Sequence, residues 1–129
     1  MSKIKNKELF LIAHNVRSIL NVGSFFRTAD GAGVKKIYLC GYTPTPTQHP
    51  EKIGKTALNA QKFVEWEYAK YATTLIKRLR KEGVRVVALE QSKKSKNLFS
   101  YKPKFPTALV VGNENRGLAR SILKECNDV

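Results

Sequence analysis

Short apolar runs alternate along the chain with stretches in which apolar residues recur at helical spacing. The first such stretch is typical: Val22, Phe25, Phe26 and Ala29 recur at intervals that place them on one face of a helix. Gly33 follows, and glycine suits the left-handed conformation that ends many helices. The pattern predicts strands at residues 9–14, 34–41, 63–68, 84–90 and 107–112. It predicts helices at residues 21–33, 51–61, 72–83 and 118–126.

Strands that alternate with helices are typical of a mainly parallel sheet flanked by helices. The apolar runs of the last two strands are nearly continuous, as expected for strands buried on both faces. The predicted fold class is therefore α/β. With 129 residues, of which 42% are hydrophobic, the chain has room for one domain with one core. Such sheets bind ligands beyond the carboxyl ends of their strands, which directs attention to the loops after Leu39, Leu89 and Val111.

The sequence NVGSFFRTADGAG, residues 21–33, combines a helical apolar face with one arginine, Arg27. At about 100° per residue, Arg27 lies on the side away from the two phenylalanines, in line with Gly23 and Asp30. One interpretation is a surface arginine paired with Asp30. The other is an anion site, because Asn21 is a good helix cap, Gly23 leaves space above the guanidinium, and arginine's planar charged fork suits a phosphate. Arg17 would add a second cation.

The sequence VVGNENRGL, residues 110–118, is an apolar strand that stops at Gly112 and passes through a polar turn into a helix. Gly112 and Gly117 permit close backbone approach or unusual dihedral angles, and exposed amides in such a turn can receive a ligand. Glu114 and Arg116 lie within the turn. The alternative is a plain strand-to-helix loop, with a capping asparagine and a glutamate near the helix dipole.

The formal net charge is +14, from 24 basic and 10 acidic residues, and such a charge attracts polyanions. The excess is concentrated, since residues 70–104 contain eleven lysines or arginines against Glu82 and Glu90, a net charge of +9. A solvated helix followed by a lysine-rich loop would account for this run. Its share of the total favours a binding face for nucleic acid, with Lys93, Lys94 and Lys96 in the loop.

The same sequence argues against several classes of protein and site. No apolar run approaches the ~20 residues of a membrane span, and the N-terminus lacks the apolar core of a signal peptide. We therefore expect a soluble, cytoplasmic protein with no membrane partner. Cys40 and Cys126 form no disulfide or zinc pattern, and His14 and His49 have no second ligand at metal spacing, so no metal is expected. A P-loop and a dinucleotide-binding glycine fingerprint are also missing from the sequence.

The segments NVRSILNVGSFFRTADGAGVKKIYLCG and TALVVGNENRGL together resemble the first two signature motifs of the SpoU (TrmH-like) class of SPOUT RNA methyltransferases. The segments TALNAQKFVEWEY and VRVVALE are similar to the stretches that connect these motifs, so the resemblance covers nearly all of the chain from Leu9. It implies an α/β fold with a C-terminal trefoil knot. It also implies an S-adenosylmethionine-dependent homodimer that methylates the ribose 2′-hydroxyl of tRNA or rRNA.

The resemblance assigns roles to individual residues. Arg27 is the implied catalytic arginine, supported by Asn21 and Glu114. Because arginine is almost never neutral in proteins, we expect Arg27 to engage the substrate phosphate and stabilise a developing alkoxide, and not to act alone as a base. The implied cofactor-binding residues are Leu89, Glu90, Gly112, Asn113 and Gly117, and the expected RNA-binding residues are Arg17, Lys93, Lys94 and Lys96.

The family's third motif, a strand with a serine- or asparagine-containing turn and a final helix, would come after ECNDV, where the sequence stops at Val129. Residues 1–129 are therefore expected to form a single SpoU-type domain that is C-terminally incomplete, without the knot-forming strand and helix. Two alternatives stay open. One is a catalytically inactive RNA-binding module derived from the same fold, and the other is an unrelated nucleotide-binding α/β protein.

Overall fold

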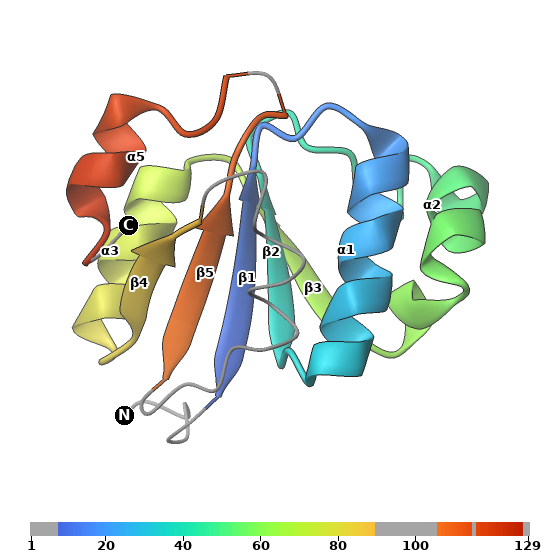
Figure 1. Ribbon diagram of the computed structural model, residues 1–129, viewed down its shortest axis with the longest axis horizontal. Helices are drawn as coiled ribbons and strands as arrows, with labels where there is room; N and C mark the ends of the chain where they lie inside the picture. Colours follow the sequence, from blue (N-terminus) through green and yellow to red (C-terminus); the bar gives the residue numbers. More distant parts are fainter. Residues whose placement is uncertain (1–7, 90–105, 115, 128–129) are drawn as a thin grey trace.

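Five strands form one sheet in the computed structural model, which describes residues 8–89, 106–114 and 116–127 (Figure 1). Every pair of neighbouring strands is parallel, in the order β3-β2-β1-β5-β4. The predicted α/β class, with a mainly parallel sheet flanked by helices, is confirmed. The strands are β1 (Leu9–His14), β2 (Lys36–Cys40), β3 (Glu65–Ala69), β4 (Arg85–Ala88) and β5 (Thr107–Val111).

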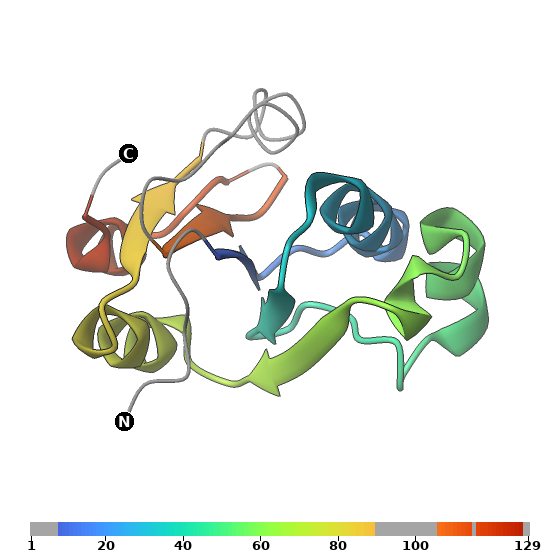
Figure 2. The same ribbon diagram turned by 90° about the horizontal axis from the view of Figure 1, so that it is seen from below.

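Helices cover both faces of the sheet. One face carries α1 and α2, and the other carries α3 and α5, as both views of the ribbon show (Figures 1 and 2). This three-layer arrangement follows from the apolar runs predicted for the strands, which need cover on both sides. The helices are α1 (Ile19–Ala32), α2 (Pro50–Ala57), the short 3-10 helix η1 (Ala60–Lys62), α3 (Ala72–Lys81) and α5 (Arg120–Glu125).

Two hydrophobic clusters, one on each face, stabilise these layers. Alternate residues of a strand point to opposite faces, so Leu11 of β1 joins Phe26 of α1 in one cluster. Its neighbour Ile12 joins Ile76 of α3 in the other. All four side chains are almost completely buried. The two phenylalanines of the first motif therefore anchor α1 on the sheet, as the helical spacing indicates.

The strand order brings the two sequence motifs together. Although β5 follows β4 in the chain, it lies between β4 and the central β1. Ala13 near the end of β1 is in register with Val111 at the end of β5. Because parallel strands end at the same edge, the turn after β5 lies beside the loop that leads from β1 into α1.

The start of α1 differs from the prediction. Its N-cap is Ser18, whose hydroxyl accepts a hydrogen bond from the Asn21 amide at 3.1 Å, so Asn21 lies inside the first turn and is not the cap. Serine and asparagine are about equally good caps, and local sequence does not choose between them. The predicted C-terminus is confirmed, since Gly33 adopts the left-handed conformation with φ of 74°.

Other boundaries shift by about two residues: β3 begins at Glu65 and α5 at Arg120. The single helix predicted at residues 51–61 is wrong, because α2 ends at Ala57, Leu58 and Asn59 have positive φ, and η1 follows as a separate turn.

Gly23 also differs from its predicted role. We expected it to leave space above Arg27, but Gly23 is buried under α2. A Cβ atom at Gly23 would lie 2.5 Å from Thr56 Cβ and 3.0 Å from the Ile53 carbonyl oxygen. The absence of a side chain thus lets α1 and α2 approach closely. The helix wheel could not reveal this, because the contact involves a second helix.

We predict that Gly23→Ala destabilises the fold even though alanine is the better helix former. The added methyl group cannot fit against Ile53 and Thr56, and the clash should outweigh the propensity gain by about 1 kcal/mol. Gly31→Ala is the matched control, because Gly31 is exposed in the same helix and the change should stabilise by about 0.5 kcal/mol. Urea unfolding measures both. Equal stabilisation by the two changes would contradict the close α1–α2 contact.

Candidate active site

Glu114, in the turn after β5, reaches across to the start of α1. Its carboxylate accepts hydrogen bonds from the Arg17 amide at 3.1 Å, the Ser18 amide at 2.8 Å and the Asn21 side-chain nitrogen at 3.1 Å. Two of the three donors are main-chain amides at the N-terminal end of the helix, where unpaired N–H groups and the helix dipole favour an anion. One side chain therefore joins the first motif to the second.

The electrostatics of Glu114 follow from these contacts. Partial burial alone would raise the pKa of its carboxyl group, but the hydrogen bonds from Ser18, Arg17 and Asn21 outweigh it and lower the pKa below the ordinary value. A carboxylate with its oxygens so engaged is a weak proton acceptor. Its position suits it to fixing the helix and the turn relative to each other.

Asn113 fixes the same turn from inside. Its side chain is only 6% exposed. The side-chain nitrogen donates to the Asn15 carbonyl oxygen at 3.1 Å and to the Tyr42 hydroxyl oxygen at 2.9 Å, while the side-chain oxygen accepts from the Arg116 amide at 3.0 Å. The amide group is thus occupied with shaping the turn.

Both glycines of the turn are required by its geometry. The backbones of Asn113 and Gly117 pair with each other, with N···O distances of 3.1 and 2.8 Å, and Gly117 has a positive φ of 69°. A Cβ atom at Gly112 would lie 2.5 Å from the Gly117 carbonyl oxygen. Glycine at both positions therefore permits the tight turn that directs Glu114 toward α1.

Two residues that sequence reasoning missed support the loop after β1. Thr43 is buried beyond the end of β2; its hydroxyl accepts from the Val16 amide at 3.1 Å and lies 2.7 Å from the Cys40 carbonyl oxygen. Asn15 has a positive φ of 54°, and its side-chain oxygen accepts from the Tyr42 amide at 3.1 Å. A threonine three residues after β2 and an asparagine directly after β1 were the available signals, but their partners are distant in sequence.

The two predicted arginines remain open to solvent. Arg27 is exposed and, within the described part of the chain, makes no hydrogen bond or ion pair. The predicted alternative, a pair with Asp30, is therefore not formed. Arg17 is exposed too, with its amide bound to Glu114. The structure thus joins Asn21 to Glu114 and leaves Arg27 about 9 Å further along the helix axis, given 1.5 Å of rise per residue.

The remaining predicted cofactor residue that is described, Leu89, lies at the end of β4. Its amide donates to the Val110 carbonyl oxygen at 2.9 Å, which extends the pairing of β4 with β5. Leu89 and Gly112 therefore follow adjacent strands at the same edge of the sheet. The other predicted residues, Glu90, Lys93, Lys94 and Lys96, lie outside the described residues.

Cysteine and histidine form no second site in the described ranges. Cys40 and Cys126 are free thiols, and burial raises their pKa to about 12 and about 11, so both stay protonated. Burial lowers the pKa of His14, which keeps its imidazole neutral at pH 7. Residues 8–89, 106–114 and 116–127 contain no group of three metal-ligating side chains. No helix among them is long and apolar enough to cross a membrane.

Comparison with known proteins agrees with this geometry. The sequence profile of the SpoU rRNA methylase family matches residues 8–129. The chain belongs to this family. A tRNA (guanosine(18)-2′-O)-methyltransferase from Aquifex aeolicus is 30% identical over 120 residues, which are 93% of this chain and 56% of that protein.

Solved structures of the family share the fold. An rRNA methyltransferase from Sinorhizobium meliloti superposes with a TM-score of 0.78 at 26% identity, over 98% of this chain and 48% of that one. The TrmH/SpoU tRNA modifying enzyme from A. aeolicus gives a TM-score of 0.71 at 26% identity, over 95% of this chain and 60% of that one. The SpoU chain described here spans about half the length of the relatives it matches.

We predict that Glu114→Gln destabilises the protein in a pH-dependent way. Because the folded-state pKa of Glu114 lies below its ordinary value of 4.5, its stabilisation is present above that value and lost as pH falls through the folded pKa. At pH 7 the variant should lose about 1 kcal/mol, or about 4 °C in Tm. The difference from wild type should shrink on acidification.

Glu51→Gln is the matched control, since Glu51 lies exposed in the first turn of α2. Its effect should stay within about 0.5 kcal/mol at all pH values. Thermal unfolding followed by circular dichroism across the acid range makes both measurements. Equal losses for the two variants at pH 7, or a Glu114→Gln effect that grows with acid, would contradict the role of the carboxylate.

Proposed function

We propose that this SpoU family member is an S-adenosylmethionine-dependent RNA methyltransferase that acts on a ribose 2′-hydroxyl of tRNA or rRNA. The observation that carries the proposal is the contact of Glu114 with the start of α1, because it joins the family's two motifs into one site. The A. aeolicus relative, named as a tRNA 2′-O-methyltransferase, supports the reaction class. An rRNA methyltransferase from S. meliloti has the same fold in an AdoMet-bound structure, with 24% identity.

The cofactor would lie where β4 and β5 end side by side. Leu89 and the backbone of Gly112, Asn113 and Gly117 border this position, and Glu90 follows Leu89 in sequence. Tight glycine turns at strand ends suit such a ligand, because the backbone there can approach it closely. When bound, S-adenosylmethionine supplies an activated methyl group.

Arg27 and Glu114 have different tasks in this proposal. A ribose hydroxyl is a poor nucleophile, so its oxygen must be oriented, and its proton would pass to solvent water as the methyl C–S bond breaks and the new C–O bond forms. The guanidinium of Arg27 is exposed and permanently charged, which suits it to holding a substrate phosphate and stabilising the alkoxide as it develops. Glu114 is a positioning residue, because it acts through Asn21 and the start of α1.

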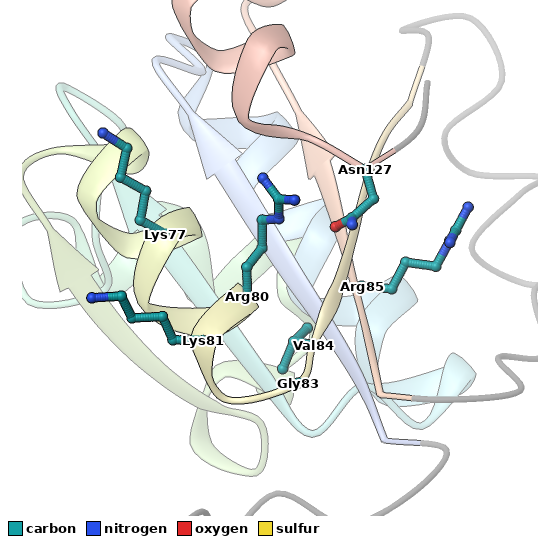
Figure 3. Close-up of a pocket in the computed structure, with 7 residues that line it drawn as sticks. All are labelled: Lys77, Arg80, Lys81, Gly83, Val84, Arg85 and Asn127. Atoms are coloured by element: carbon teal, nitrogen blue, oxygen red, sulfur yellow. The ribbon is translucent and has the colours of Figure 1, made fainter.

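RNA as the partner is supported by a basic groove at the opposite, amino end of β4. Its volume is about 630 Å³. Arg80 extends between α3 and β4 toward the end of α5, where its guanidinium donates to the Glu125 carbonyl oxygen at 3.1 Å (Figure 3). The nearest carboxylate oxygen of Glu125 lies 3.8 Å from the Lys77 ammonium. The groove is lined by Lys77, Arg80, Lys81, Gly83, Val84, Arg85 and Asn127.

The second candidate function is an RNA-binding module of the same fold without catalysis. The basic groove favours it, because phosphate binding there needs neither Arg27 nor a cofactor.

For the enzyme, we further propose a homodimer in the cytoplasm. Leu20 at the start of α1 is 63% exposed, and a second copy of the chain would cover such an apolar side chain.

We predict that Arg27→Ala lowers methyl transfer to RNA by at least about 100-fold, because a donor to the developing charge is lost. Affinity for S-adenosylmethionine, measured by calorimetry, should stay within about three-fold, since the cofactor position lies at other strand ends. Lys35→Ala is the control for lost charge, because Lys35 is exposed in the connection between α1 and β2. Unchanged methyl transfer in Arg27→Ala would show that the assignment is wrong.

We predict that replacing Lys93, Lys94 and Lys96 by alanine flattens the dependence of RNA affinity on salt. Three lost phosphate contacts should reduce the slope of log K against log salt by about 2 to 3. The matched control replaces Lys52, Lys55 and Lys62, which are exposed on α2 and η1, by alanine. It changes the net charge by the same amount but should leave the salt dependence of RNA affinity nearly as steep as in wild type. Equal slopes for the two triple variants would exclude Lys93, Lys94 and Lys96 from the RNA-binding face.

A further inference from the structure

Two tyrosines with anchored hydroxyl groups lie along the carboxyl edge of the sheet, and about half of each residue is exposed. Tyr68, near the end of β3, donates its hydroxyl to the Gly41 carbonyl oxygen at 2.9 Å. Tyr42, just after β2, accepts from the Asn113 side chain at 2.9 Å through its hydroxyl oxygen. Tyr42 is 56% and Tyr68 47% exposed. We call this pair the tyrosine shelf.

The shelf leads toward the candidate active site. Tyr68 reaches from β3 to the residue that follows β2, and Tyr42 reaches from there to the turn that follows β5. The Tyr42 amide is held in turn by the Asn15 side chain at 3.1 Å. Each ring is therefore fixed at both its backbone and its hydroxyl end, so little conformational freedom would be lost on contact with a ligand.

A pocket of about 290 Å³ lies against the shelf. Trp66, the one tryptophan of the sequence, lines it beside the two tyrosines. The rest of the lining is polar, with hydroxyl and amide groups from Thr45, Thr47 and Gln48. Aromatic faces beside hydrogen-bonding groups fit a planar, polar ring better than an apolar peptide side chain.

We propose that the tyrosine shelf and its pocket bind an unstacked base of the RNA substrate, next to the nucleotide that is methylated. The inference rests on the proposed function and adds the place where bases, as distinct from phosphates, are held. Sequence-tolerant RNA binding commonly uses stacking on exposed aromatic rings together with basic surface. The net charge of +14 supplies the attraction for the backbone, and the shelf supplies contact with the base.

Substitutions at Tyr68 separate stacking from hydrogen bonding. Tyr68→Leu should weaken binding of a single-stranded RNA oligonucleotide about ten-fold, with an unchanged salt slope, because a ring and no charge is lost. Tyr68→Phe keeps the ring and should stay within about two-fold. Phe63→Leu is the control, since Phe63 is 79% exposed but lies before β3, at the amino end of the strands and away from the shelf. Wild-type affinity in Tyr68→Leu would overturn the proposal.

Trp66 provides a direct report of the pocket. Its fluorescence should change when the oligonucleotide binds, and should not change when an abasic ribose-phosphate strand of equal length binds at low salt. An identical change with both strands would overturn the proposal. Failure of wild-type protein to bind any RNA would contradict the proposed function itself. If RNA binds but its affinity is unaffected both by Tyr68→Leu and by removal of the bases, only the proposed role of the tyrosine shelf is contradicted.

Discussion

The carboxylate of Glu114, held by Asn21 in the first turn of α1 and by the two amides that precede this helix, is the interaction on which the rest of the candidate site depends. It satisfies two amide donors that the helix cannot satisfy itself, and it orients Asn21. Its partners are more than ninety residues away in sequence. The turn that carries it exists because Gly112 has no side chain and Gly117 adopts a positive φ. Two glycines and one acid thereby fix where α1 presents Arg27.

The strand order makes this interaction possible. Insertion of β5 between β1 and β4 places the ends of three strands side by side, one leading to α1, one to the glycine turn and one to Leu89. The two ends of the sheet then differ in chemistry. The carboxyl edge has the anchored carboxylate, the exposed Arg17 and the tyrosine shelf, while the amino end of β4 has the basic groove. An RNA, unlike a single nucleotide, is long enough to contact both.

The periodicity of the sequence was sufficient to predict most of the helices, the strands and the fold class, because burial on both faces of the strands leaves a clear apolar pattern. It could not identify Ser18 as the cap in place of Asn21, since both residues are good caps and the choice depends on Glu114. It also could not place Gly23 under α2. One interpretation of the sequence placed Glu114 near the positive end of the dipole of the helix that follows it. Glu114 does lie at the positive end of a helix dipole, but the helix is α1. Local sequence reveals which groups need partners, whereas the topology decides which partners they meet.

We propose that the site joined by Glu114 transfers a methyl group to a ribose oxygen. The most direct measurement is nucleoside mass spectrometry of tRNA and rRNA after incubation with the protein and isotopically labelled S-adenosylmethionine. We expect the label on 2′-O-methylated nucleosides. Label on a base, or no label together with full RNA binding, would contradict it.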